Sequence, residues 1–101
     1  MISYERFKEL CESIGLVEKL DSKYTPGFKF FSFSFGDFYK KDCCVYNKKW
    51  GMRVCSILDE SNVGCWEIEE SELLPRFEML KEEIRQIKMK YKMDRIEKDF
   101  V

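Results

Sequence analysis

The sequence predicts an α+β fold, with an N-terminal helix, a three- to four-stranded antiparallel sheet and a long C-terminal helix. Two changes of apolar spacing carry this prediction. The spacing is helical over residues 4–14, alternates through much of residues 28–68, and is helical again over residues 71–100. Since 101 residues suffice for one comfortable core, we expect a single domain over residues 1–101.

The N-terminal helix is predicted over residues 4–14. Ser3 is suited to cap its start, because a serine oxygen can accept a backbone hydrogen bond there. Gly15 is a typical helix stop, and Leu16 is placed to fold back on the helix end. Beyond it, we expect Val17 and Leu20 to anchor the chain to the core.

The sheet is predicted from the alternation that begins at Phe28. Phe31, Phe33 and Phe35 are separated by serines, as in a strand with one buried face. The adjacent Cys43 and Cys44 should point to opposite faces of a strand. Short connections favour an antiparallel meander. The later strands are expected at residues 43–46 (or from 38), 50–58 and 63–68.

The C-terminal helix is predicted over residues 71–100, capped by Ser71. Pro75 leaves a second possibility, in which the helix begins at Pro75 after a separate turn. Alternating steps of three and four residues define a first apolar seam, which we interpret as the part that packs on the sheet. It comprises Leu73, Phe77, Leu80, Ile84, Ile87 and Tyr91.

A second apolar set lies almost opposite the first seam, near the end of this helix. It comprises Met89, Met93, Ile96 and Phe100, with steps of four, three and four residues. A helix that closes a small monomer needs one apolar side only, and methionine adapts to irregular partners. This pattern predicts a protruding helix tip that binds a second copy or another protein. A frayed tail and a tip that folds back on its own protomer are the alternatives.

A basic stripe runs between the two apolar sets. Arg85, Lys88, Lys92 and Arg95 form its main part, and we interpret them as contacts for an acidic partner or a phosphate. The simpler interpretation is a solvated helix face, because acidic residues are interspersed along the same helix.

Composition argues against several classes of function. The net charge of −1 disfavours a dedicated nucleic-acid binder, and no segment is apolar enough to span a membrane. The absence of histidine and of any C-x-x-C pair leads us to expect no metal, no cofactor and no enzyme activity. The five cysteines are expected to be reduced, mostly buried residues, in a cytoplasmic protein.

Aromatic residues of the predicted sheet offer one further candidate site. Phe28 and Phe30 lie on the opposite face from Phe31, where they could stack on a flat ligand. Trp50 and Trp66 are expected in a core or an interface.

The sequence therefore predicts a non-enzymatic intracellular binding protein that modulates or inhibits a macromolecular partner. A homodimer formed through the C-terminal helix is the expected form. By size and composition alone, inhibitors, immunity proteins and phage-encoded modulators are comparable. The alternative is a module that binds or sequesters a nucleotide-like molecule in a pocket at the dimer interface.

Overall fold

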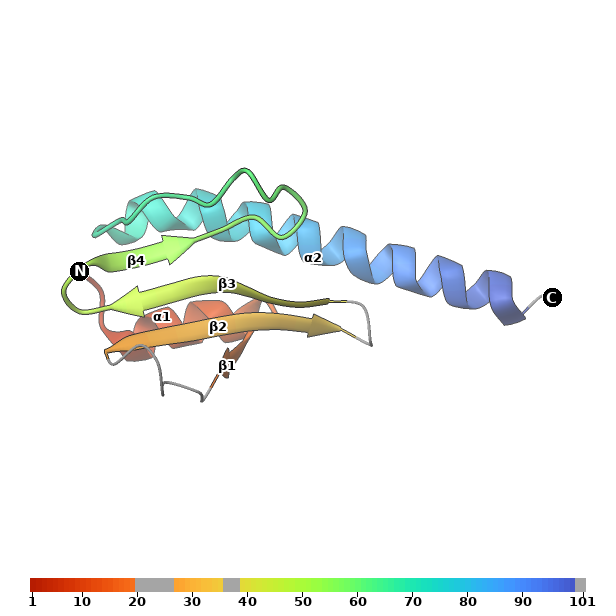
Figure 1. The fold of residues 1–101 in the computed structure, drawn as a ribbon, viewed down its shortest axis with the longest axis horizontal. Coiled ribbons are helices and arrows are strands. Elements are labelled where there is room, and N and C mark those ends of the chain that lie inside the picture. The colour runs from red at the N-terminus through yellow and green to blue at the C-terminus, as the bar shows by residue number, and fades with distance from the viewer. Residues whose placement is uncertain (20–26, 36–38, 100–101) are drawn as a thin grey trace.

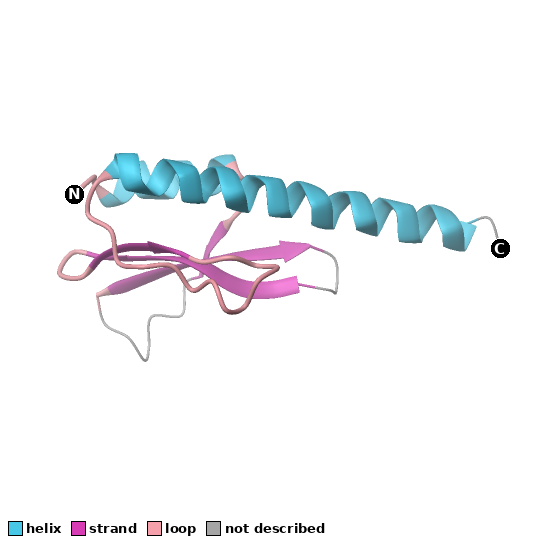
Figure 2. Cartoon of the chain, turned by 90° about the horizontal axis from the view of Figure 1, so that it is seen from above, coloured by secondary structure: helices cyan, strands magenta, loops and turns pink. Residues whose placement is uncertain are grey.

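The computed structural model describes residues 1–19, 27–35 and 39–99. Its elements are α1 (Tyr4–Ser13), β1 (Val17–Lys19), β2 (Phe28–Phe35), β3 (Tyr39–Asn47), β4 (Gly51–Val54) and α2 (Glu70–Asp99). The four strands are antiparallel neighbours in the order β1-β2-β3-β4 (Figure 1). Both helices lie on one face of this sheet (Figure 2), so the predicted α+β fold is confirmed.

Helix α1 begins and ends through local signals in the sequence. The Ser3 hydroxyl accepts a hydrogen bond from the backbone N–H of Arg6 at 3.2 Å, which caps the first turn. After Gly15, whose φ of +96° turns the chain, the N–H of Leu16 donates to the carbonyl of Cys11 at 3.0 Å. Leu16 is buried, as expected from a residue that folds back on the helix end.

The segment after α1 differs from the prediction. Val17 is 67% exposed and does not anchor the core, because β1 pairs with β2 and presents Val17 beside Ser32 on the outer face. Leu20 lies outside the described residues. β1 was not predicted as a strand, since three residues are too few to show an alternating pattern.

The later strands also differ from the prediction: the strand expected at residues 50–58 spans only Gly51–Val54, and the strand expected at residues 63–68 does not form. This segment contributes one isolated bridge, in which the N–H groups and carbonyls of Met52 and Glu67 exchange hydrogen bonds at 2.8 and 2.7 Å. The segment therefore runs beside β4 without becoming a strand of the sheet.

A β-bulge explains the burial of two adjacent cysteines. Phe31 pairs with Cys44 and Ser32 pairs with Asp42, which leaves Cys43 as an extra residue of β3. Both thiols are buried, because the bulge interrupts the regular alternation of faces. Strict alternation, which we had assumed for these two residues, does not hold at a bulge.

Helix α2 closes the core over the inner face of the sheet. Five residues of the predicted seam are buried, namely Leu73, Phe77, Leu80, Ile84 and Ile87, and the side chain of Tyr91 lies outside the described part. The helix begins at Glu70, so Ser71 is not its cap and Pro75 lies within it rather than at its start. Pro75 has no N–H to donate to the Ser71 carbonyl, a loss of one hydrogen bond near a helix end.

The connection from β4 to α2 is fastened by one carboxylate. Glu83 on α2 accepts hydrogen bonds from the hydroxyl of Ser56 and from the backbone N–H groups of Ile57 (3.0 Å) and Leu58 (3.3 Å). Ser56 is itself buried and its oxygen accepts from the N–H of Asp59 at 2.9 Å. A side chain of the helix thus replaces the strand hydrogen bonds that this connection lacks.

We expect the Gly51→Ala variant to be destabilised by about 3 kcal/mol, which urea denaturation would measure. Gly51 has a φ of +107°, and an added Cβ would lie 2.6 Å from the carbonyl oxygen of Glu67. Gly15→Ala is the matched control, because its φ is +96° but the nearest atom to the new Cβ is 3.9 Å away. The control should lose about 1 kcal/mol. Equal losses in the two variants would contradict a clash at Gly51.

Candidate functional site

The candidate site is the part of α2 that extends beyond the sheet. Ile87 is the last residue of the helix that the described side chains show as buried, while its backbone remains helical to Asp99. Residues 88–99 therefore extend the helix by about 18 Å. Both views show this part projecting away from the sheet and α1 (Figures 1 and 2), and the molecule measures 53 Å along its longest axis against 30 and 25 Å along the others.

Met89 begins the second apolar set and half of it is exposed, at 50% of its surface. The Nη1 atom of Arg85 lies 3.3 Å from its sulfur, so the charged group borders this apolar residue. Met93 and Ile96 lie on the projecting helix, but their side chains are outside the described part, and Phe100 is outside the described residues altogether.

The basic stripe is only partly available for a partner. The Nε of Arg85 donates to Glu82 at 2.9 Å; this hydrogen bond raises the pKa of Arg85 and lowers the pKa of Glu82. The Nζ of Lys88 lies 3.9 Å from where a Cβ on Gly15 would sit, near the partially negative end of α1. Lys92 and Arg95 lie on the projecting helix, with side chains outside the described part.

The outer face of the sheet carries the aromatic pair that was predicted for stacking. The rings of Phe28 and Phe30 stack with centroids 6.1 Å apart and 15° between their planes. Trp66 meets Phe28 edge-on at 6.1 Å, and the guanidinium of Arg53 lies 5.8 Å from the Trp66 ring centre. The side chains of this cluster are half-buried: Phe28, Phe30, Arg53 and Trp66. They pack on one another over the outer face of the sheet. Trp50, by contrast, is 57% exposed in the turn before β4.

No family model, curated protein or solved structure matches this chain.

Two observations on the described side chains concern covalent and metal chemistry. Burial raises the pKa of the Cys44 thiol well above its ordinary value, and the neighbouring Cys11 reinforces this shift. A thiol held neutral in this way is a poor nucleophile. Within the described ranges, no three His, Cys, Asp or Glu side chains are placed to hold a metal ion.

Two carboxylates meet near the start of α2. A hydrogen bond with Glu67 raises the pKa of Glu72, and the Coulomb repulsion between the two acts in the same direction. Both groups lie near a helix N-terminus, where carboxylates commonly stabilise the helix.

A helix that crosses a membrane needs about 20 mostly apolar residues. In the described part of the chain, neither helix has the length and hydrophobicity to cross a bilayer.

One feature was missed by the sequence analysis. A cavity lies between the start of α1 and the turn joining β3 to β4. Figure 1 shows this turn at the end of the molecule opposite the tip of α2. Lys29, Lys48 and Lys49 line it. The sequence shows these lysines, but only the pairing of β2 with β3 brings Lys29 beside the turn.

Proposed function

We propose that this protein acts by binding, and that it forms a homodimer through the projecting part of α2. In this form it would modulate a macromolecular partner without catalysing a reaction. The observation that carries the proposal is the continuation of α2 over residues 88–99, beyond Ile87. A helical extension that packs on nothing gains only the small propagation free energy of each added residue, so a second surface that packs on the tip would explain why it stays helical.

The spacing of the second apolar set supports a helix as that second surface. Steps of four, three and four residues from Met89 to Phe100 are those of a two-helix seam. The half-exposed Met89 would occupy the inner end of this seam. A two-fold axis near Met93 would then place Met89 of one protomer close to Ile96 of the other.

The charges favour an antiparallel arrangement of the two tips. Residues 85–92 carry four basic residues and no acidic one, whereas residues 93–99 carry three acidic and two basic residues. An antiparallel pair places each basic segment opposite the more acidic segment of the partner. A parallel pair would place the two basic segments together, which is unfavourable.

We expect the intact protein to have the mass of two chains by light scattering, and the Met93→Glu variant to have the mass of one. A glutamate in the seam would be buried without a partner charge in the dimer. Leu74→Glu is the matched control, because Leu74 is an exposed apolar residue near the start of α2 and far from the tip. The control should remain dimeric.

Deletion of residues 93–101 should likewise give a monomer, with unchanged packing of the sheet in the near-ultraviolet circular dichroism spectrum. A monomeric mass for the intact protein at high concentration would refute the homodimer. A dimeric mass for Met93→Glu would place the interface elsewhere on the molecule.

A further inference from the structure

We propose that the cavity between α1 and the β3–β4 turn binds a phosphate-bearing small molecule of nucleotide size. Such binding would be independent of the proposed dimer, since the β3–β4 turn that lines the cavity lies at the opposite end of the molecule from the tip of α2 (Figure 1). Its volume of about 720 Å³ lies within the range of about 300–1,000 Å³ that small-molecule sites occupy.

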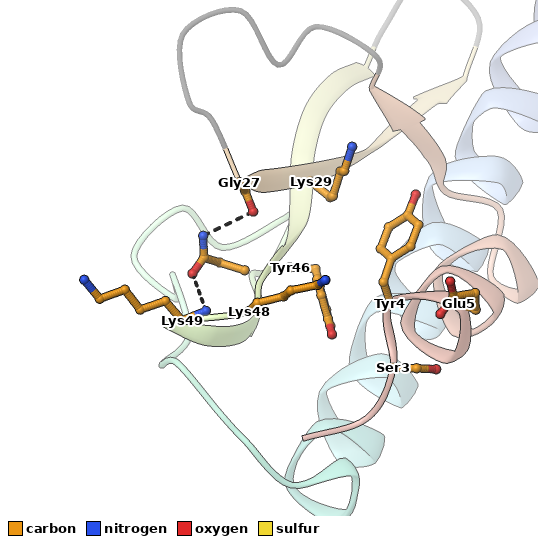
Figure 3. A pocket seen from close by; sticks show the side chains of 9 residues that line it. Ser3, Tyr4, Glu5, Gly27, Lys29, Tyr46, Lys48 and Lys49 are labelled. Carbon is orange, nitrogen blue, oxygen red and sulfur yellow. Dashed lines mark hydrogen bonds between the residues drawn. The ribbon is translucent and has the colours of Figure 1, made fainter.

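The charges around the cavity favour an anion. Three lysines line it, Lys29, Lys48 and Lys49, against one carboxylate, Glu5. Among the ion pairs formed by described residues, none involves any of these three lysines. Figure 3 shows Lys48 extending from the turn toward the side of Tyr4, whereas Lys49 points the other way. Lys29 and Lys48 are therefore the two ammonium groups that would contact the ligand.

A buried asparagine fixes the backbone of the turn that carries Lys48 and Lys49 before any ligand binds. The Oδ1 of Asn47 accepts hydrogen bonds from the backbone N–H groups of Lys49 and Trp50, both at 2.8 Å. Its Nδ2 donates to the carbonyl of Gly27 at 3.2 Å, just before β2 (Figure 3). The turn that carries Lys48 is thus fixed to the strand that carries Lys29. Such preorganisation lowers the entropic cost of binding.

The ring of Tyr4, backed by the buried ring of Tyr46, forms the apolar wall of the cavity. Tyr4 and Tyr46 meet edge-to-face with centroids 5.7 Å apart. The hydroxyl of Tyr46 donates to the carbonyl of Ile2 at 3.0 Å, and the Nζ of Lys29 lies 6.0 Å from the centre of the Tyr4 ring. Burial raises the pKa of both tyrosines, with the Glu18 carboxylate adding to the effect at Tyr4. Tyr46 is only 4% exposed, so the half-buried, neutral ring of Tyr4 is the one that offers contact to a flat, uncharged part of a ligand.

The start of α1 adds to the preference for an anion. Ser3, the N-cap of α1, and Glu5 in the first turn line the cavity, so the partially positive N-terminal end of the helix borders it. Together with the two ammonium groups, this end suits phosphate oxygens, while the tyrosine wall suits a base or sugar ring. The combination points to a nucleoside phosphate rather than to inorganic phosphate alone.

Titration calorimetry with ATP, and separately with inorganic phosphate, tests the proposal on the intact chain. We expect saturable binding of ATP that is tighter than that of inorganic phosphate. Lys29→Gln and Lys48→Gln should each weaken ATP binding by about tenfold, as expected from the loss of one charge-assisted contact. Lys81→Gln is the matched control, because it removes the same charge from an exposed position on α2, and it should bind ATP as the unmodified protein does.

Three results would overturn the proposal. ATP could fail to bind, ATP could bind no more tightly than inorganic phosphate, or the double variant of Lys29 and Lys48 could retain full affinity. Because both lysines lie at the surface of the cavity, circular dichroism should show that the variants keep their fold. Trp50, which is exposed and follows Lys49 directly, gives an independent fluorescence signal for binding at this end of the molecule.

Discussion

Replacing Phe7 by alanine is expected to lower the free energy of unfolding by about 3–5 kcal/mol. Phe7 is fully buried and its ring contacts both the sheet and α2. Its ring lies 5.5 Å from the ring of Phe31 on β2, 5.5 Å from Tyr46 on β3 and 5.9 Å from Phe77 on α2. The cavity left by alanine would therefore separate α1 from both the sheet and α2.

Thermal unfolding followed by circular dichroism would measure this loss. For a domain of this size, 1 kcal/mol corresponds to about 4–8 °C, so the midpoint should fall by at least about 12 °C. Phe30→Ala is the matched control, because Phe30 is only half-buried on the outer face and contacts the stacked ring of Phe28. A loss in Phe7→Ala no larger than in this control would argue against Phe7 as a central core contact.

Replacing Glu83 by glutamine is expected to cost about 2 kcal/mol of stability. The two carboxylate oxygens accept from three donors, the Ser56 hydroxyl and the N–H groups of Ile57 and Leu58. Glutamine keeps one acceptor and presents an NH₂ group to donors at the other position, so at least one N–H loses its partner. The connection between β4 and α2 should then open before the rest of the fold.

Hydrogen exchange at Ile57 and Leu58 would detect this opening, and urea denaturation would give the change in stability. Glu82→Gln is the neighbouring control, because Glu82 is exposed and pairs with Arg85 on the surface of the same helix. Such surface pairs contribute less than about 1 kcal/mol. Similar losses for the two variants, with unchanged exchange at Ile57, would show that Glu83 does not hold the connection.

The helices were predictable from the sequence because their signals are local. The Ser3 cap, the stop at Gly15 and the seam from Leu73 to Ile87 each depend on residues a few positions apart. Only the start of α2 was misplaced, since Glu70 and the tolerated Pro75 blur that boundary.

The sheet was predictable as a class but less so in its details. The strand at β1 depends on pairing with β2, and the bulge at Cys43 depends on the register of β3 against β2. The segment at residues 63–68 has strand-like composition, yet Glu67 makes only one bridge with Met52. Such features are decided by long-range contacts, which a local pattern does not contain.

The projecting part of α2 and the lysine-lined cavity also differ in how far the sequence predicts them. The apolar set on α2 was predicted from helical spacing, and Met89 is exposed as that spacing requires. The cavity was not predicted, because Tyr4, Lys29 and Lys48 come from three separate segments that only the fold brings together. The stacking role suggested for Phe28 and Phe30 is reduced by their contacts with each other and with Trp66.

The continuity of α2 has a consequence for the shape of any complex. Residues 76–99 contain neither glycine nor proline, so the half packed on the sheet and the half beyond Ile87 belong to one stiff rod. The direction and the rotational phase of its outer half are consequently set by the core. Inserting one residue after Ile87 would turn every later side chain by about 100° and advance it by about 1.5 Å. Natural variation in the length of this rod would therefore change how two bodies are oriented, without any change in the contacting residues.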